Sequence, residues 1–320
     1  MPDTQWFADC GWGVFCHYLA NPPSTKTNTP LSAEAWNQQV DAFDVDGLAQ
    51  QLEAVKAPYF FITIGQGSGH FCAPSDTYDK LTGITPSKCS QRDLVADLHA
   101  ALAPRGIKLL VYSAAEIGWG DAEARPGLKL THHHSDPDSG GTKIWRRHRQ
   151  VAFMKNIEAI HREWSIRWGN KVAGWWIDGC YEEEYRFPDD KAPNFKTFAD
   201  SLRAGNRDAI VCFNTGVRTP ISCTTQYEDY TAGEIADALP ESPGAWIDKQ
   251  GHKARYHVLS YLGDYWCKGA PRFPTALVTG YTEHVMSKGG VMTWDVPIAQ
   301  NGLIPEAFIQ QLAQIRKPPR

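Results

Sequence analysis

The sequence predicts an α/β fold, a single (β/α)8-like TIM barrel spanning residues 1–320. Apolar runs of strand length alternate with longer helical patterns, and we count eight such units. No linker or internal repeat divides the chain, and barrels of this kind routinely occupy about 250 residues as one domain. The alternative is a doubly wound open sheet with a phosphate-binding loop. Gly65–Gly69 follows the second strand, but its spacing matches neither a dinucleotide motif nor a P-loop.

Each expected strand is a short, mostly apolar run. The alternation is regular up to Asn214, where the first five expected strands are 12–17, 59–64, 107–112, 172–178 and 209–214. Beyond Asn214 the pattern weakens, and the remaining strands are expected near 223–227, 257–262 and 290–294.

The expected helices are bounded by ordinary start and stop signals. They cover 46–55, 91–102, 143–168, 195–204 and 305–315. Asp46 suits the positive end of the first helix, Pro104 and Gly106 stop the second, and Pro305 fits a first helical turn.

Composition excludes several classes of protein. With 42% hydrophobic and 21% charged residues the chain is expected to be soluble and globular, and a net charge of −4 argues against nucleic-acid or anionic-membrane partners. No run reaches 18 apolar residues, and the first residues lack a secretory pattern. Two compartments stay open: the cytoplasm for the chain as given, and a secreted or periplasmic place if a signal peptide was removed. The eight scattered cysteines form no C-x-x-C motif, and most are expected to be buried thiols.

Polar residues at the carboxyl ends of barrel strands are the natural site candidates. They are His17, Gln66, His70, Glu116, Asp178, Asn214, Glu228, Asp229, Glu234, Asp264 and Asp295. The set is rich in carboxylates and lacks a nucleophilic Ser or Cys beside a His. Because glycoside hydrolysis requires paired carboxylates, the first enzyme hypothesis is a glycosidase.

Five segments, in order, resemble α-L-fucosidases of glycoside hydrolase family 29. They are 6–17, 92–113, 176–179, 229–234 and 285–305, and together they cover the catalytic barrel of that family but not its C-terminal β-sandwich. The resemblance implies a retaining exo-glycosidase that acts on an oligosaccharide or glycoconjugate with a terminal α-linked sugar and needs no cofactor or metal.

The resemblance also implies roles for individual residues. Asp178, which ends an apolar strand, would be the nucleophile and Glu234 the acid/base, with Glu228, Asp229 and Asp248 as alternative acids. Asp178 could instead cap a helix or pair with Arg218, and Glu234 could simply begin a helix. The expected substrate contacts are His17, Gln66, His70, Glu116, Trp176, Asn214, Glu228, Asp229, Trp294 and Asp295. Further candidate sugar platforms are Trp246 and Trp266, because aromatic faces stack on sugars.

The chain departs from the family after the second strand. Gly65 and Gln66 stand where the family carries two sugar-binding histidines. A site built on such hydrogen bonds discriminates strongly, so two alternatives stay open: a glycosidase of the same mechanism for another deoxy sugar or a pentose, and a sugar-binding barrel without catalysis. We expect 132–134 to be a solvated histidine loop rather than a metal site, and 182–184 to be a solvated acidic run, with one member at the pocket rim as the alternative.

Overall fold

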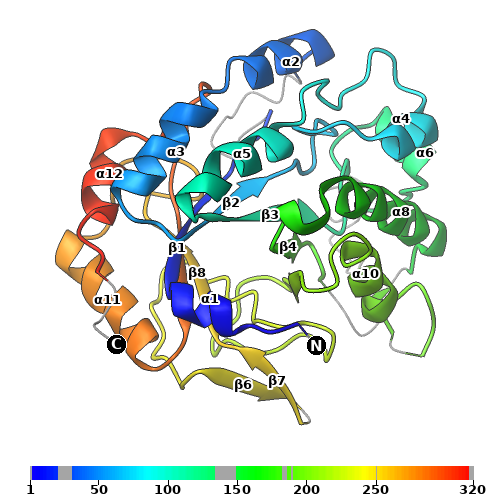
Figure 1. Cartoon of the computed structure of the whole chain (residues 1–320). Coiled ribbons are helices and arrows are strands. Elements are labelled where there is room, and N and C mark those ends of the chain that lie inside the picture. The colour runs from blue at the N-terminus through cyan, green and yellow to red at the C-terminus, as the bar shows by residue number, and fades with distance from the viewer. Residues whose placement is uncertain are drawn as a thin grey trace.

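The computed structural model describes residues 2–20, 31–133, 149–181, 186–188, 190–249 and 251–316. Its centre is a curled sheet of seven parallel strands in the order β5-β4-β3-β2-β1-β9-β8 (Figure 1). The strands are β1 (Trp12–Cys16), β2 (Tyr59–Thr63), β3 (Lys108–Ala114), β4 (Gly174–Asp178), β5 (Ile210–Phe213), β8 (His257–Tyr261) and β9 (Val291–Asp295). The architecture is α/β and barrel-like, as predicted from the alternation.

Helices cover the outer face of the curled sheet (Figure 1). They are α2 (Ala33–Asp41), α3 (Val45–Ala54), α4 (Asp76–Thr82), α5 (Leu94–Leu102), α6 (Ala124–Leu128), α8 (Val151–Trp168), α10 (Phe195–Leu202), α11 (Thr275–Ser287) and α12 (Glu306–Leu312). Short 3-10 turns cover Ala103–Arg105 and Gly169–Lys171. Helix α1 (Gln5–Cys10) precedes β1, and β6 (Trp246–Lys249) pairs with β7 (His252–Arg255) in a separate antiparallel hairpin.

The expected strands are confirmed at seven of eight positions, and the strand expected at 223–227 is wrong. That stretch forms turns, and no ladder joins β5 to β8 in the described part of the chain. Instead the segment 229–235 lies between them. The Asp229 amide donates to the Val211 carbonyl of β5, and the Ile235 amide donates to the Leu259 carbonyl of β8.

Gly233 explains why this segment is not a regular strand. Its φ of +65° is left-handed, and a side chain there would collide with the His257 carbonyl, so the backbone touches β8 closely but cannot continue a ladder. The expectation of eight regular strands is therefore corrected to seven strands and one irregular segment.

The helix boundaries also differ in detail. Helix α5 begins at Leu94 rather than 91 because the Asp93 side chain accepts a hydrogen bond from the Ala96 amide and caps it. Helix α8 begins at Val151, and the expected helical residues 143–148 lie outside the described residues. Several elements were not predicted from the sequence: helices α1, α2, α4, α6 and α11, and the β6–β7 hairpin.

Side chains alternate between two layers of the curled sheet. Val14, Val111 and Val211 point outward and pack under the helices, whereas Phe15 and Tyr112 point into the interior. The alternation of inward and outward side chains continues for one or two residues beyond the strand ends. His17, Asp178 and Asn214 each follow an inward residue by two positions, so they gather at the mouth of the sheet.

Helix α1 closes the opposite end of the interior. Phe7 is fully buried and contacts the rings of Tyr59, Tyr230 and His257. The interior is therefore packed at the amino ends of the strands.

The eight cysteines are all buried free thiols, as predicted for most of them. Within the described ranges, no helix combines the length and apolar character needed to cross a membrane.

Candidate active site

A pocket of about 180 Å³ opens at the carboxyl ends of the strands. We call it the central pocket. Its lining residues are His17, Gln66, Tyr112, Trp176, Asp178, Glu234, Leu259, Tyr265 and Trp266. In barrels of this kind the chemistry takes place at this end of the sheet.

Asp178, the last residue of β4, is held by three hydrogen bonds. The Tyr112 hydroxyl donates to its Oδ2 at 2.7 Å, and the Gly179 amide and Asn214 Nδ2 donate to its Oδ1 at 2.8 and 2.9 Å. Burial and the Asp178 charge keep the pKa of Tyr112 well above its ordinary value, so the phenol stays protonated and acts as a donor. The carboxylate is thus fixed with its face toward the pocket.

Gln66 orients the Tyr112 hydroxyl toward Asp178. Its Nε2 donates to the Tyr112 hydroxyl oxygen at 2.5 Å, which leaves the single phenolic proton to point at Asp178. The sequence suggested Gln66 as a substrate contact. In the structure it lines the pocket and contacts the nucleophile candidate Asp178 indirectly, through the Tyr112 hydroxyl.

Glu234 faces Asp178 across the amide of Asn214. One nitrogen, Asn214 Nδ2, donates to Asp178 Oδ1 at 2.9 Å and to Glu234 Oε2 at 2.7 Å, so these two oxygens are at most about 5.6 Å apart. Glu234 reaches this place through the irregular segment, whose backbone bonds to Leu259 on both sides of it.

The two carboxyl groups have different environments. Burial, together with the nearby negative charge of Asp178, raises the pKa of Glu234 to about 7, while the hydrogen bond from Asn214 opposes the shift. A carboxyl group with a pKa near neutrality next to a firmly hydrogen-bonded carboxylate can serve as a proton donor beside a nucleophile.

His17 directly follows β1, and its ring is oriented by Asp295. Its Nδ1 is 2.7 Å from Oδ1 of the buried Asp295, whose Oδ2 accepts the Cys267 amide at 2.8 Å. Because Nδ1 is engaged, Nε2 is the ring nitrogen left to face a ligand in the central pocket. Asp295 therefore acts on the pocket through His17 and does not line it.

Aromatic rings form the other wall. Trp176 stacks on Tyr112 with centroids 5.3 Å apart, and its indole N–H is used by the Ala232 carbonyl at 3.0 Å. Trp266 and Tyr265 come from the loop after β8, and Trp266 meets His17 edge-on. A lining that combines carboxyl groups and a histidine with aromatic rings suits a sugar, which has both polar and apolar surface.

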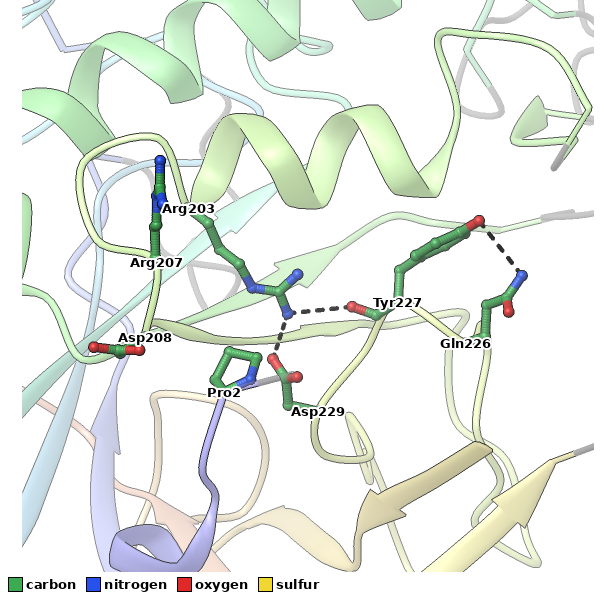
Figure 2. A pocket seen from close by; sticks show the side chains of 7 residues that line it. All are labelled: Pro2, Arg203, Arg207, Asp208, Gln226, Tyr227 and Asp229. Atoms are coloured by element: carbon green, nitrogen blue, oxygen red, sulfur yellow. Dashed lines mark hydrogen bonds and ion pairs between the residues drawn. The ribbon is translucent and has the colours of Figure 1, made fainter. Parts of the chain in front are cut away.

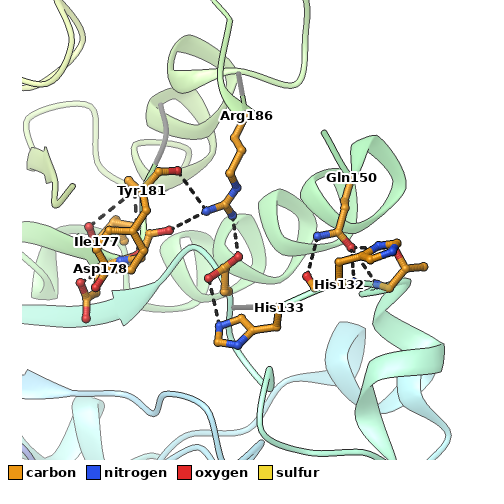
Figure 3. Close-up of polar contacts among 11 residues, drawn as sticks. His132, His133, Gln150, Ile177, Asp178, Tyr181 and Arg186 are labelled. Carbon is orange, nitrogen blue, oxygen red and sulfur yellow. Dashed lines mark hydrogen bonds and ion pairs between the residues drawn. The ribbon is translucent and has the colours of Figure 1, made fainter. Parts of the chain in front are cut away.

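Glu116 does not line the central pocket but holds the loop behind it. It forms an ion pair with Arg186 at 2.9 Å, its Oε2 lies 3.2 Å from His133 Nε2, and all three side chains are buried. Arg186 also donates to the carbonyls of Gly179 and Tyr181, so this cluster fastens the chain that follows Asp178 (Figure 3).

Four other candidates lie away from the central pocket. His70 is buried against Trp36, and Trp294 points outward from β9 and donates to Thr282 on α11. Glu228 is buried and accepts the Thr224 amide. The parity of β9 could have shown the orientation of Trp294, because it lies one residue from the inward Asp295.

The fourth, Asp229, borders a larger pocket of about 410 Å³ (Figure 2). Burial raises the pKa of its carboxyl group, against the opposing effect of the Arg203 ion pair. This pocket is the larger of the two, but it lies beside the first residues of β5, the amino end of the sheet. Position favours the central pocket as the site of chemistry, since barrels bind substrates at the carboxyl ends.

The remaining candidates lie in the β6–β7 hairpin, in the histidine run 132–134 and in the acidic run 182–184. Asp248 bonds the Gly251 amide in the hairpin turn, and the neighbouring Trp246 is 44% exposed under the Arg255 guanidinium. The acidic run 182–184 and His134 lie outside the described residues. His133 is buried rather than solvated, and among the residues described no His, Cys, Asp or Glu cluster could hold a metal ion.

Sequence reasoning did not single out Tyr112, Leu259 or Tyr265. The signal for Tyr112 was present, because it follows the inward Leu110 by two residues. Tyr265 lies in a loop, where no periodicity indicates the direction of a side chain.

Comparison with known proteins gives structural relatives only. No family model matches the chain, and no curated protein matches it in sequence. An endo-fucoidan hydrolase of glycoside hydrolase family 107, P5AFcnA, superposes with a TM-score of 0.70 and 14% identity over 98% of this chain and 92% of its own.

Two α-L-fucosidases are also similar. Isoenzyme 1 from Paenibacillus thiaminolyticus has a TM-score of 0.67 and 17% identity over 97% of this chain and 73% of its own. AlfC from Lactobacillus casei has a TM-score of 0.64 and 16% identity over 97% and 95%. These structural neighbours are glycoside hydrolases that act on fucose-containing substrates, and at this identity the likeness shows a shared α/β fold.

Proposed function

We propose that this protein is a retaining exo-glycosidase resembling α-L-fucosidases, with Asp178 as nucleophile and Glu234 as acid/base. The observation that carries the proposal is the pair of carboxyl groups joined by Asn214. Retaining enzymes hold their two carboxyl groups about 5 to 5.5 Å apart, whereas inverting enzymes leave about 6.5 to 9.5 Å for a water molecule. An upper limit of about 5.6 Å between the bridged oxygens favours the retaining geometry.

In the first step an Asp178 oxygen attacks the anomeric carbon while the bond to the leaving oxygen breaks. Protonated Glu234 gives its proton to that oxygen, and the product is a glycosyl ester of Asp178. In the second step the Glu234 carboxylate takes a proton from water as the water oxygen attacks the anomeric carbon. Asp178 is released as a carboxylate and Glu234 is protonated again.

The lining of the central pocket supports a glycone at a chain end. The pocket is small, and its lining includes His17, with Asp295 behind it, and the rings of Trp176 and Trp266. The structural neighbours that act on fucose make α-L-fucoside the first substrate to test. Gly65 and Gln66 at the departure from the fucosidase motif keep another deoxy sugar or a pentose as the alternative glycone.

The test is hydrolysis of a panel of nitrophenyl glycosides, α-L-fucoside included, by the wild type and Asp178→Asn, with anomers followed by NMR. We expect one glycoside to release its sugar with retained configuration and the variant to lose this activity. Asp248→Asn on the surface hairpin is the matched control and should keep wild-type turnover. Inverted product would overturn the retaining assignment. If no glycoside of the panel is hydrolysed but a sugar raises the thermal stability of the protein, the chain would be a sugar-binding protein instead.

A further inference from the structure

One of the donors to the Asp178 carboxylate is a backbone amide. The Gly179 amide donates to Asp178 Oδ1 at 2.8 Å, and the φ of Gly179 is +72°, a left-handed conformation that suits glycine. A side-chain donor such as Tyr112 is directed by its own rotamer, whereas an amide is directed by the backbone on both sides of it. The orientation of this donor therefore depends on what holds residues 178–181.

Two groups hold this stretch of backbone. The Asp178 carbonyl, which shares a peptide plane with the Gly179 amide, accepts from the Ala115 amide at 2.8 Å, just beyond β3. The next plane is held by Arg186, whose Nη1 donates to the carbonyls of Gly179 and Tyr181 at 3.0 and 3.3 Å (Figure 3). Because glycine is the most flexible residue type, both planes beside it must be held to keep its amide directed at the carboxylate.

Arg186 is itself fixed by Glu116, two residues beyond the end of β3. Its Nη2 lies 2.9 Å from Glu116 Oε1, and His133 Nε2 lies 3.2 Å from Glu116 Oε2. The His133 ring in turn stacks on Trp119, with centroids 4.3 Å apart. Glu116 and Arg186 are only 2% and 3% exposed, so water screens their interaction little.

A buried ion pair is a weak source of stability, because the cost of desolvating two charges offsets much of their attraction. What the Arg186 guanidinium offers, and an apolar side chain lacks, is a rigid fork of donors. One nitrogen of the fork pairs with the Glu116 carboxylate and another holds two backbone carbonyls. This geometry favours a role in positioning the backbone.

We propose that Glu116 and Arg186 are positioning residues for the nucleophile. Glu116 fixes Arg186, Arg186 fixes the backbone at Gly179, and the Gly179 amide stays directed at Asp178 Oδ1. Neither Glu116 nor Arg186 lines the central pocket, so their loss should slow the chemical step more than it weakens sugar binding. This inference rests on the proposed function, because it takes Asp178 as the nucleophile.

The experiment separates stability from activity in a double variant, Glu116→Gln with Arg186→Met. Arg186→Met alone leaves a buried carboxylate without its guanidinium and should lower the denaturant midpoint, whereas the double variant removes both charges and should bring the midpoint back toward that of the wild type. Its kcat should still be about 10- to 100-fold lower on the glycoside that the nitrophenyl panel identifies, because nothing holds the Gly179 carbonyl. Its affinity for the released sugar should stay within about twofold.

The matched control is the double variant Arg203→Met with Asp229→Asn. This pair has the same chemistry, and its guanidinium also bonds backbone carbonyls, those of Ala209 and Tyr227, but it lies at the amino end of the sheet. It should keep kcat within about twofold of the wild type.

Arg186→Lys gives a second test that does not depend on how the double variant folds. Its ammonium can pair with Glu116 but has no fork to hold the two carbonyls as well. We therefore expect nearly wild-type stability and a kcat about tenfold lower.

The outcomes distinguish this inference from the proposed function. Wild-type kcat in the Glu116→Gln, Arg186→Met variant or in Arg186→Lys, or an equal loss of kcat in the control pair, would overturn the positioning role and leave the glycosidase standing. A wild type inactive on every glycoside would overturn the proposed function and the positioning role with it.

Discussion

Asn214 contacts both of the proposed catalytic carboxyl groups with one side chain. Its amide nitrogen has two hydrogens, and each is used by a different carboxylate. An aspartate at this position would place a third negative charge between them. Amide chemistry therefore allows two acidic groups to stand close together without a cation between them.

The Tyr112 hydroxyl should matter for the nucleophile. Tyr112→Phe removes the donor to Asp178 Oδ2 but keeps the ring that stacks on Trp176. A hydrogen bond to a charged group contributes about 1.5–3 kcal/mol, so kcat/KM should fall about 10- to 100-fold. Tyr18→Phe is the control, because that buried hydroxyl bonds backbone carbonyls away from the pocket. Unchanged kinetics for Tyr112→Phe would show that Asp178 does not need this bond.

Glu234 should set the basic limb of the pH profile. Burial raises its pKa to about 7, and the first step requires its protonated form. Activity should therefore be high below about pH 7 and fall as the pH rises through that value, because the proton donor is lost. In Glu234→Gln the basic limb near pH 7 should vanish from the residual hydrolysis of a nitrophenyl glycoside. A limb that persists in this variant would assign the titration to another group.

At the level of the elements, strand parity decides which side chains reach the pocket. On β4, Trp176 points inward and lines the central pocket, whereas Trp175 packs under the helices. On β9, Asp295 points inward and Trp294 outward. A tryptophan on these strands therefore either lines the central pocket or packs under the helices, depending on its position along the strand.

Two matched substitutions test this parity. Trp294→Phe should keep kcat/KM within about twofold and cost about 1–3 kcal/mol of unfolding free energy, because it loses the bond to Thr282 and some packing volume. Trp176→Phe changes the pocket wall and should lower kcat/KM by more than tenfold. Denaturant unfolding and steady-state kinetics on both variants give the comparison. A larger kinetic effect for Trp294→Phe would contradict the assigned register.

On the scale of the whole molecule, the sheet has one closed end and one open end. Helix α1 places Phe7 against Tyr59, Tyr230 and His257 at the amino end. The ends of the strands and the irregular segment meet at the other end. The central pocket therefore opens at the end that carries Asp178 and Glu234.

Phe7→Ala should test how much this closure stabilises the fold. Removing a fully buried phenylalanine leaves a cavity and costs about 3–5 kcal/mol. We expect a lower denaturant midpoint and an unchanged kcat for the protein that remains folded, since Phe7 lies far from the open end. Leu277→Ala on the exposed side of α11 is the control and should change stability little. A small cost for Phe7→Ala would mean that α1 is not part of the cooperative core.

The sequence by itself determined the α/β class, seven of the strands and the place of Asp178 at a strand end. These features depend on local periodicity. A short apolar run such as that of β4 predicts a buried strand without knowledge of the rest of the fold. Its fucosidase-like segment also pointed to Glu234. The sequence did not determine that 229–235 would be irregular, because the collision that requires Gly233 involves His257, which is distant in the chain.

Only the tertiary structure decided which of the polar residues meet. Asp178, Asn214 and Glu234 come from three separate segments, and their distances depend on how the sheet curls. Glu116, Glu228 and Asp229 have the same chemistry in the sequence, yet each is turned toward a partner away from the central pocket. Carboxylates are alike in a sequence. In the folded chain, burial beside Asp178 raises the pKa of Glu234 to about 7, and the other three carboxylates each contact a structural partner.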